Sequence, residues 1–316
     1  MKLVGLFFSI AILSFTSLHA QDSVYNKSTP IELITGTGTI YGTLMVPSNV
    51  KGRIPLALII AGSGPTDRDG NNSMMKNNSL KQLAESLATN GIASLRYDKR
   101  GVADSKQAGK SEADLKFEDY INDANDWIKL LKQNIMYSKI IVIGHSEGSL
   151  IGMNAAKNAE GFISLAGAGY SADLILKNQL GAQGKQIQEM CFPIIDSLKE
   201  GKLVTNVNLM LSSLFRSSVQ PYMISWFKHN PQADIKQLKF PSLIIQGDND
   251  LQISLDDARQ LSAASPKSKL VIIEKMNHVL KIVDSGDRSA NVAAYSNPTM
   301  PIAKELTNAI VGYIKK

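Results

Sequence analysis

Short apolar runs alternate along most of the chain with stretches whose apolar residues repeat at helical spacing. The continuous runs are typical of strands buried on both faces of a parallel sheet, and they occur in PLALIIAGSGP, IASLRYD, KIIVIG, GFISLAGAG, FPSLIIQG and SKLVIIEKM. The amphipathic stretches are NNSLKQLAESLATNG, FEDYINDANDWIKLLKQN, SEGSLIGMNAAKNA and IAKELTNAIVGYIKK. This alternation predicts an α/β fold, a mostly parallel, doubly wound sheet with helices on both faces.

Two stretches depart from this rhythm. IELITGTGTIYGTLMVP alternates apolar residues with Gly and Thr, which favours an antiparallel hairpin or meander before the parallel strands. Residues 169–238 carry helical patterns and no strand signal. An insertion of this length between two strands predicts a helical cap, at about 169–238, over one edge of the sheet.

The first twenty residues have the layout of a secretory signal peptide. Lys2 is followed by an apolar stretch from Val4 to Phe15, and the segment ends in the small residue Ala20. The stretch is short for a membrane span, although an uncleaved N-terminal anchor is the alternative. We therefore expect a signal peptide over 1–20 and an α/β domain over 21–316 that carries the cap insertion. Export to the periplasm or the medium follows, with no stable membrane insertion after cleavage.

Composition narrows the classes of partner and cofactor. The formal charge is +6, or +5 without Lys2, and the sequence pI is about 9.1. Lys and Arg are scattered rather than clustered, which argues against a nucleic-acid partner. Cys191 is the only cysteine, so no intramolecular disulfide is available. No CxxC or HExxH motif is present, and we expect neither a metal nor an organic cofactor.

The segment IIVIGHSEGSLIG places Ser146 between a predicted strand and a predicted helix. Gly144 and Gly148 flank the serine at the spacing of a G-x-S-x-G nucleophile elbow. Such a turn is tight and strained, and any side chain at the glycine positions would crowd the backbone. The alternative is an ordinary glycine-containing turn, but the strand before and the helix after favour a nucleophile.

A serine nucleophile needs a base, and the base needs an orienting acid. His278 follows the last predicted strand and fits the base position, because the expected chain order is Ser, acid, His. His145 is expected only to fill space in the elbow, and His229 precedes the best acid. Asp250 lies just past a strand end and is the favoured acid. Asp248 is closer to that strand, and we expect it to shape the turn through its own backbone.

An oxyanion hole requires two backbone N–H donors. The N–H of Glu147, directly after the nucleophile, is one candidate. The N–H of Ser63, in the AGSGP loop after an apolar strand, is the second. The side chain of Glu147 is expected to form structural hydrogen bonds.

These segments together resemble the α/β-hydrolase superfamily, in particular bacterial esterase-like members with a helical cap. The resemblance runs from about Val24 to the C-terminus and rests on AGSGPTDRDGN, YDKRG, GHSEG, GDND, MNH and ANVAAYSNPTMPI. It implies a sheet of about eight strands and hydrolysis of carboxylic esters. The sequence departs from the family pattern at Ala61, where a His often precedes the glycine, but the backbone donor of Ser63 survives that change.

The segment TDRDGNN resembles a calcium loop, but Asn72 and Asn78 occupy the positions of the EF-hand glycine and its twelfth ligand. We expect Asp67, Arg68 and Asp69 to form ion pairs with YDKR instead.

The apolar residues of the cap either line an acyl pocket or pack the cap on the core: Met210, Phe215, Met223, Trp226 and Phe227.

The sequence thus predicts a serine hydrolase that cleaves a small-molecule carboxylic ester through an acyl-enzyme intermediate. A serine peptidase or aminopeptidase-like hydrolase of the same fold is the main alternative. A non-catalytic binding protein is a third possibility, but such a protein would be expected to lack a triad member.

Overall fold

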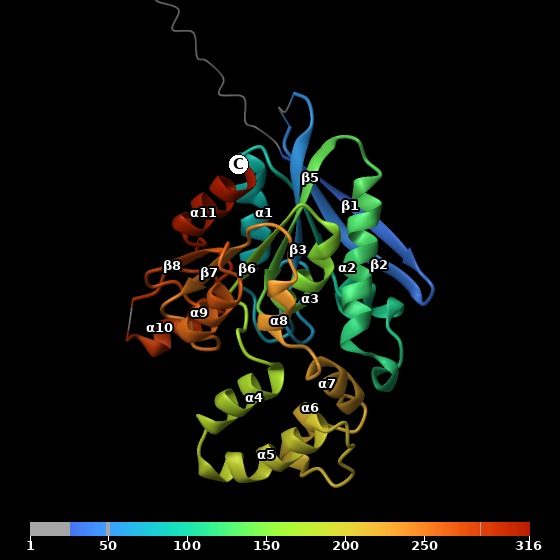
Figure 1. Ribbon diagram of the computed structural model, residues 1–316, viewed down its shortest axis with the longest axis vertical. Coiled ribbons are helices and arrows are strands. Elements are labelled where there is room, and N and C mark those ends of the chain that lie inside the picture. The colour runs from blue at the N-terminus through green and yellow to red at the C-terminus, as the bar shows by residue number, and fades with distance from the viewer. Residues whose placement is uncertain (1–25, 49–50, 285) are drawn as a thin grey trace, which may run out of the picture.

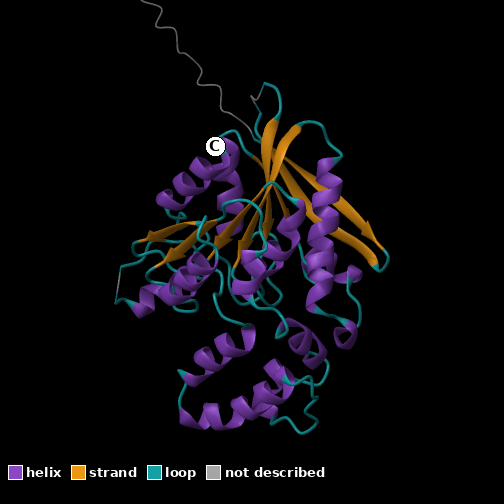
Figure 2. Ribbon diagram, viewed as in Figure 1, coloured by secondary structure: helices purple, strands orange, loops and turns teal. Residues whose placement is uncertain are grey.

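The computed structural model describes residues 26–48, 51–284 and 286–316 (Figures 1 and 2). The signal peptide expected over residues 1–20 lies outside these ranges. Within them, no helix combines the length and the apolar character that a membrane crossing requires.

One eight-stranded sheet organises the molecule, in the order β1-β2-β4-β3-β5-β6-β7-β8. β1 pairs antiparallel with β2, and β2 antiparallel with β4, whereas all other neighbours are parallel. The strands are β1 Lys27–Thr35, β2 Gly38–Val46, β3 Ile54–Ile60, β4 Ala93–Tyr97, β5 Tyr137–His145, β6 Gly161–Leu165, β7 Leu243–Gly247 and β8 Lys269–Ile273. The predicted fold class and the antiparallel start of the sheet are confirmed.

Helices cover both faces of this sheet (Figure 2). The α-helices are α1 Ser79–Thr89, α2 Phe117–Lys132, α3 Glu147–Ala155, α4 Ala172–Gly181, α5 Lys185–Lys199, α6 Ser212–Phe215, α7 Gln220–Trp226, α8 Pro231–Lys236, α9 Leu255–Ala264, α10 Arg288–Ala294 and α11 Lys304–Ile314. Short 3-10 helices are η1 Ala103–Ala108, η2 Glu112–Asp114, η3 Ala156–Asn158 and η4 Leu209–Leu211.

The core consists of two apolar layers, one on each face of the sheet. α1 and α11 bury their apolar sides on one face, together with β3, β5 and β7 side chains. α2, α3 and α9 cover the other face, where Trp127 and Phe117 are fully buried. Both layers leave the carboxyl ends of the parallel strands uncovered, and in an open α/β sheet this edge is where ligands bind.

Helices α4 to α7 lie beyond this edge (Figure 1). They enclose an apolar core of their own, in which Cys191, Phe215 and Phe227 are fully buried. α8 packs against α3 and α9 of the main body. All five helices lie between β6 and β7, the interval in which the sequence predicts helices without strands.

Candidate active site

Ser146 occupies the turn between β5 and α3 in a strained conformation. Its φ is 56° and its ψ is −122°, a backbone geometry that costs a residue other than glycine about 1–3 kcal/mol. The turn places Ser146 at the N-terminal end of α3, where free N–H groups and the helix dipole favour negative charge.

The two glycines beside Ser146 leave no room for a side chain. A Cβ at Gly144 would lie 2.1 Å from the carbonyl oxygen of Gly148. A Cβ at Gly148 would lie 2.4 Å from the carbonyl oxygen of Ile60 and 2.6 Å from that of Ala61. Both obstacles are backbone atoms, so the elbow requires glycine at both positions.

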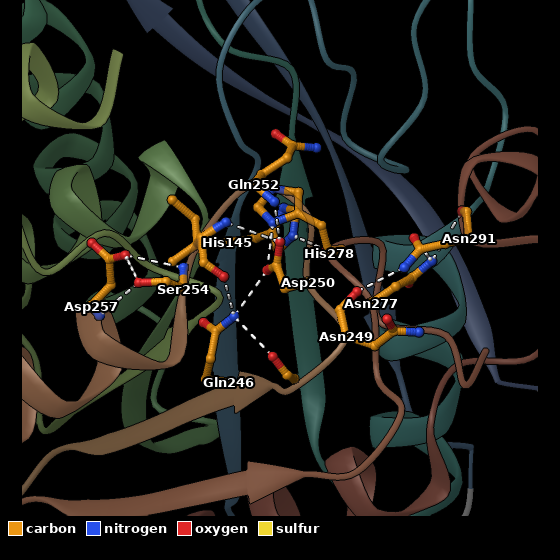
Figure 3. A network of polar contacts seen from close by, with 12 residues as sticks. His145, Gln246, Asn249, Asp250, Gln252, Ser254, Asp257, Asn277, His278 and Asn291 are labelled. Atoms are coloured by element: carbon orange, nitrogen blue, oxygen red, sulfur yellow. Dashed lines mark hydrogen bonds and ion pairs between the residues drawn. The ribbon is translucent and has the colours of Figure 1, made fainter. Parts of the chain in front are cut away.

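The structure brings Asp250 and His278 into direct contact. Asp250 follows β7 and His278 follows β8, and these strands are parallel neighbours whose carboxyl ends lie side by side. His278 Nδ1 lies 2.8 Å from Asp250 Oδ2 (Figure 3). In the described part of the chain, no hydrogen bond joins His278 to Ser146; such contacts are often long in the absence of substrate.

Asp250 is buried but accepts four hydrogen bonds. Besides His278, the amide Nε2 of Gln246 donates to Oδ2 over 3.0 Å, and the N–H groups of Gln252 and Ile253 donate to Oδ1 over 2.7 and 3.0 Å. Burial alone would raise the pKa of this carboxyl. The electrostatic interaction with His278 and these hydrogen bonds outweigh burial and lower the pKa of Asp250 below its usual value.

An ionised Asp250 determines the tautomer of His278. A carboxylate only accepts hydrogen bonds, so His278 Nδ1 carries the proton that points at Asp250. The other ring nitrogen, Nε2, is then left with a free lone pair. This is the arrangement of an orienting acid and a base.

His145 has a role that the sequence analysis missed. Its Nε2 lies 2.8 Å from the carbonyl oxygen of His278, and the two rings pack with centroids 4.9 Å apart (Figure 3). Because a carbonyl only accepts, this Nε2 carries a proton. Burial, followed by the neighbouring His278, lowers the pKa of His145 to about 4. His145 is therefore a neutral donor that holds the His278 backbone, rather than a residue that only fills space.

The other two candidates, His229 and Asp248, lie apart from this pair. His229 faces Glu118 and Asp234 at 3.4 and 3.7 Å, near the start of α2. Asp248 Oδ1 accepts the N–H of Lys275 over 2.6 Å. Asp248 thus holds the turn after β8. The expectation that it would bond within its own turn was wrong, because Lys275, at φ 60°, directs its N–H at the Asp248 carboxylate.

The two candidate oxyanion donors, Ser63 and Glu147, line the same cavity as Ser146. Glu147 is the first residue of α3, so its N–H has no partner within the helix. Across the described residues, neither this N–H nor that of Ser63 donates to another backbone group. The loop before Ser63 passes so close that a Cβ at Gly62 would lie 3.1 Å from Ser146 Cβ.

Comparisons with known proteins show which hydrolases this chain resembles. A family model described as "Serine aminopeptidase, S33" matches residues 75–225. Esterase EstD of Thermotoga maritima is 26% identical over 295 residues, which cover 88% of this chain and 66% of that protein. The chain thus has the α/β-hydrolase fold and is similar in sequence to esterases of that superfamily. It spans about two thirds of the length of the curated relative that it matches.

Solved structures also share the α/β-hydrolase fold of this chain. Est1E from Butyrivibrio proteoclasticus, with ferulic acid bound, has a TM-score of 0.59 and 18% identity over 90% of this chain and all of that one. Pyrococcus furiosus esterase Pf2001 has a TM-score of 0.58 and 16% identity over 92% of this chain and 91% of that one. A bromoperoxidase from Bacillus anthracis has a TM-score of 0.55 and 16% identity over 91% of this chain and all of that one. At such identities the likeness establishes the fold.

A cavity of about 400 Å³ opens beside Ser146 in this α/β-hydrolase. It lies between the cap helices and the carboxyl ends of the strands. Its floor includes Ser63, Ser146 and Glu147, and its walls are mostly apolar, with Leu150, Ala172, Ile175, Leu176, Leu214, Val219, Met223, Trp226 and Ile253 among them. A volume of this size suits a small organic ligand.

Two of the five predicted pocket residues, Met223 and Trp226, line this cavity. Phe215 and Phe227 do not line it, because both point into the core of the cap and are fully buried there. Met210 does not line it either: 76% of its surface is exposed to solvent. Tyr222, which lines the cavity from α7, was not singled out from the sequence.

A buried ion pair lies beneath the cavity floor of the α/β-hydrolase. Lys99 Nζ lies 3.0 Å from Glu147 Oε2, and the two side chains are only 1% and 3% exposed. Tyr222 donates its hydroxyl to the other carboxylate oxygen of Glu147. The expectation of a structural hydrogen-bonding role for this carboxylate is thus confirmed, and the cap is bonded to the elbow.

The loop that resembled a calcium site is closed by protein groups. Asp67 Oδ1 accepts the N–H groups of Asp69 and Asn71 over 2.9 and 2.8 Å. Arg68 pairs with Asp98 at 2.6 Å, as expected, whereas Asp69 pairs with Arg96 at 2.9 Å, just before YDKR. Across the described ranges, no group of three or more His, Cys, Asp or Glu side chains is placed to hold a metal ion.

Proposed function

We propose that this protein is a serine hydrolase that cleaves carboxylic esters through an acyl-enzyme intermediate. One observation carries the proposal: a serine in a strained elbow faces an apolar cavity beside a buried Asp250–His278 pair. The esterase relative and the esterase structures support the same class of reaction.

In this mechanism Ser146 attacks the acyl carbonyl carbon and His278 Nε2 takes its proton. Asp250 stabilises the imidazolium that forms, without taking a proton itself. The N–H groups of Ser63 and Glu147 donate to the tetrahedral oxyanion, and loss of one such donor typically costs about 10²–10³-fold in kcat. His278 then protonates the leaving alcohol, and a water molecule activated by His278 releases the acid.

The cavity favours an ester over a peptide as substrate. An aminopeptidase needs a free acidic group to bind the substrate's terminal amine. Among the described residues that line the cavity, Glu147 is the only acidic one, and Lys99 and Tyr222 already occupy its carboxylate. The family model named for a serine aminopeptidase keeps peptide hydrolysis as the second candidate.

Two experiments test this proposal. A fluorophosphonate probe should label the wild type and leave Ser146→Ala unlabelled; an unlabelled wild type would refute catalysis by serine. A panel of p-nitrophenyl esters, from acetate to palmitate, should be turned over faster than aminoacyl p-nitroanilides. Faster cleavage of the anilides would establish the peptidase instead.

We also propose that the protein is exported. The apolar stretch after Lys2 and the small residue Ala20 support a cleaved signal peptide. N-terminal sequencing of protein from the periplasm or medium should begin near Gln21. A protein that keeps Met1 and stays in the cytoplasm would contradict export.

A further inference from the structure

Lys99 has no part in the mechanism above, yet it is a cation buried beside the site, with only 1% of its side chain exposed. It follows β4 by two residues, and its ammonium reaches two groups. Nζ donates to the carbonyl oxygen of Gly62 over 2.5 Å and to Glu147 Oε2 over 3.0 Å. It also lies 5.0 Å from the centre of the Tyr120 ring.

The contact with Gly62 acts on a candidate oxyanion donor. The carbonyl of Gly62 and the N–H of Ser63 belong to one peptide group, and this peptide is trans. In a planar trans peptide the C=O and the N–H point in opposite directions. An ammonium that holds the oxygen on one side therefore fixes the direction of the Ser63 N–H on the other.

The loop itself offers little to fix this orientation. Gly62 and Gly64 flank Ser63, and Gly64 adopts a φ of 69°, so the chain is permissive on both sides. A charge-assisted bond is about twice as strong as one between neutral groups. Hydrogen bonds in series also polarise one another, so Lys99 makes the Ser63 N–H a stronger donor as well as a fixed one.

The second candidate donor belongs to the same network. Glu147 supplies its N–H to the oxyanion site, and its carboxylate binds Lys99. Tyr222, from the cap helix α7, holds the other carboxylate oxygen. One buried cation thus connects both donors. A buried ion pair is often no more stabilising than apolar side chains of the same volume, so stability alone gives little reason for it.

We propose that Lys99 is a positioning residue for the oxyanion hole. It orients the Gly62–Ser63 peptide and anchors Glu147, so that both N–H groups converge on the oxyanion. The inference rests on the proposed function, since it assigns Lys99 to the same site. Lys99 itself touches neither the substrate nor the reacting atoms.

The test removes the charge while retaining volume. Lys99→Met leaves Glu147 buried without its partner and could unfold the protein, so Lys99→Met/Glu147→Gln is made as well. The double variant keeps the backbone N–H at position 147 and an oxygen for Tyr222. Arg96→Met is the matched control: Arg96 is a buried cation of β4, paired with Asp69, and it contacts neither Gly62 nor Glu147.

The readouts are kcat and KM for the best p-nitrophenyl ester, and Ki for a boronic acid that forms a tetrahedral adduct with serine. We expect both Lys99 variants to lower kcat by about 10–100-fold, less than the loss of a whole donor. KM should change less than about threefold, since the oxyanion contact belongs to the transition state. Ki for the boronic acid should rise by a factor similar to the fall in kcat/KM, whereas Arg96→Met should leave both unchanged.

The outcomes separate this inference from the proposed function. A wild type that is neither labelled by fluorophosphonate nor active on esters would refute the proposed function. An active wild type whose folded Lys99 variants keep its kcat and its boronic acid Ki would refute only the role of Lys99. Equal losses in Arg96→Met would also refute it, because they would mean that a buried cation without contact to Gly62 or Glu147 has the same effect.

Discussion

The hydrogen bond from His145 to the His278 carbonyl predicts a specific dependence of stability on pH. His145 is buried, and its neutral form donates from Nε2. Protonation would bury a positive charge next to His278, and the nearby Asp250 offsets that charge only in part. The folded protein therefore resists protonation of His145, whereas the unfolded chain does not.

The sign and size follow from the two pKa values. The pKa is about 4 in the folded protein, against 6.5 for a free histidine. Below pH 6.5 the unfolded chain binds more protons at this residue, so the free energy of unfolding falls as pH falls. The loss from this residue is about 1 kcal/mol at pH 5.5 and nears its full value at pH 4.5. It is complete, at about 3 kcal/mol, below pH 4.

Urea unfolding at pH 7.5, 5.5 and 4.5 would measure this loss in the free energy of unfolding. His145→Gln keeps an N–H donor for the His278 carbonyl but cannot titrate. Its stability relative to wild type should therefore improve by about 2–3 kcal/mol between pH 7.5 and 4.5. His145→Phe also loses the donor, and at pH 7.5 it should be less stable than His145→Gln by about 1–3 kcal/mol. If wild type and His145→Gln lose stability in parallel on acidification, the reasoning is refuted.

Three further predictions concern the elbow, the acid and the cavity. Gly148→Ala places a Cβ 2.4 Å from the Ile60 carbonyl oxygen and should lower the free energy of unfolding by about 3 kcal/mol; an unchanged urea midpoint would contradict this packing. Gln246→Met removes one of the four hydrogen bonds to Asp250 and should lower kcat about fivefold, since a bond of this kind contributes about 1 kcal/mol. Steady-state kinetics should show this fall in kcat with KM unchanged. A kcat equal to that of wild type would show that the amide has no influence on the acid. Trp226→Ala enlarges the cavity and should move the best p-nitrophenyl ester to a longer acyl chain; an unchanged optimum would place the acyl group elsewhere.

The fold could be predicted from the sequence because the patterns that indicate its strands and helices are local. Each parallel strand is a short apolar run, and each helix between them repeats its apolar residues at helical spacing. The candidate triad was accessible for a related reason. Ser146, Asp250 and His278 follow three parallel strands, and the carboxyl ends of such strands meet at one edge.

The supporting contacts could not be predicted because they join distant parts of the chain. Lys99 and Gly62 are 37 positions apart, and His145 and the His278 carbonyl are 133 apart. No periodicity marks such pairs. Gln246 is an amide at the next-to-last position of a buried strand, which was a visible signal for a polar partner, but its target depended on the fold of the following turn.

The cap residues show a second limit. Met223 and Phe227 are one helical turn apart and both belong to the cap core, yet only Met223 also lines the cavity. Their side chains are equally apolar, and hydrophobic pattern alone does not distinguish a core from a pocket wall. The packing of α5 against α7 decides between them, and only the tertiary structure contains it.

The separate core of the cap has a consequence for how this protein can change over evolution. Its central residues Cys191, Phe215 and Phe227 contact one another rather than the apolar layers on the sheet. Substitutions in the cap should therefore combine additively with substitutions under the sheet, because the two sets share few neighbours. Trp226 is the exception, since it packs against both cores. Substitutions in the cap can thus change the substrate range without disturbing the residues under the sheet. A substitution at Trp226 would affect both cores at once.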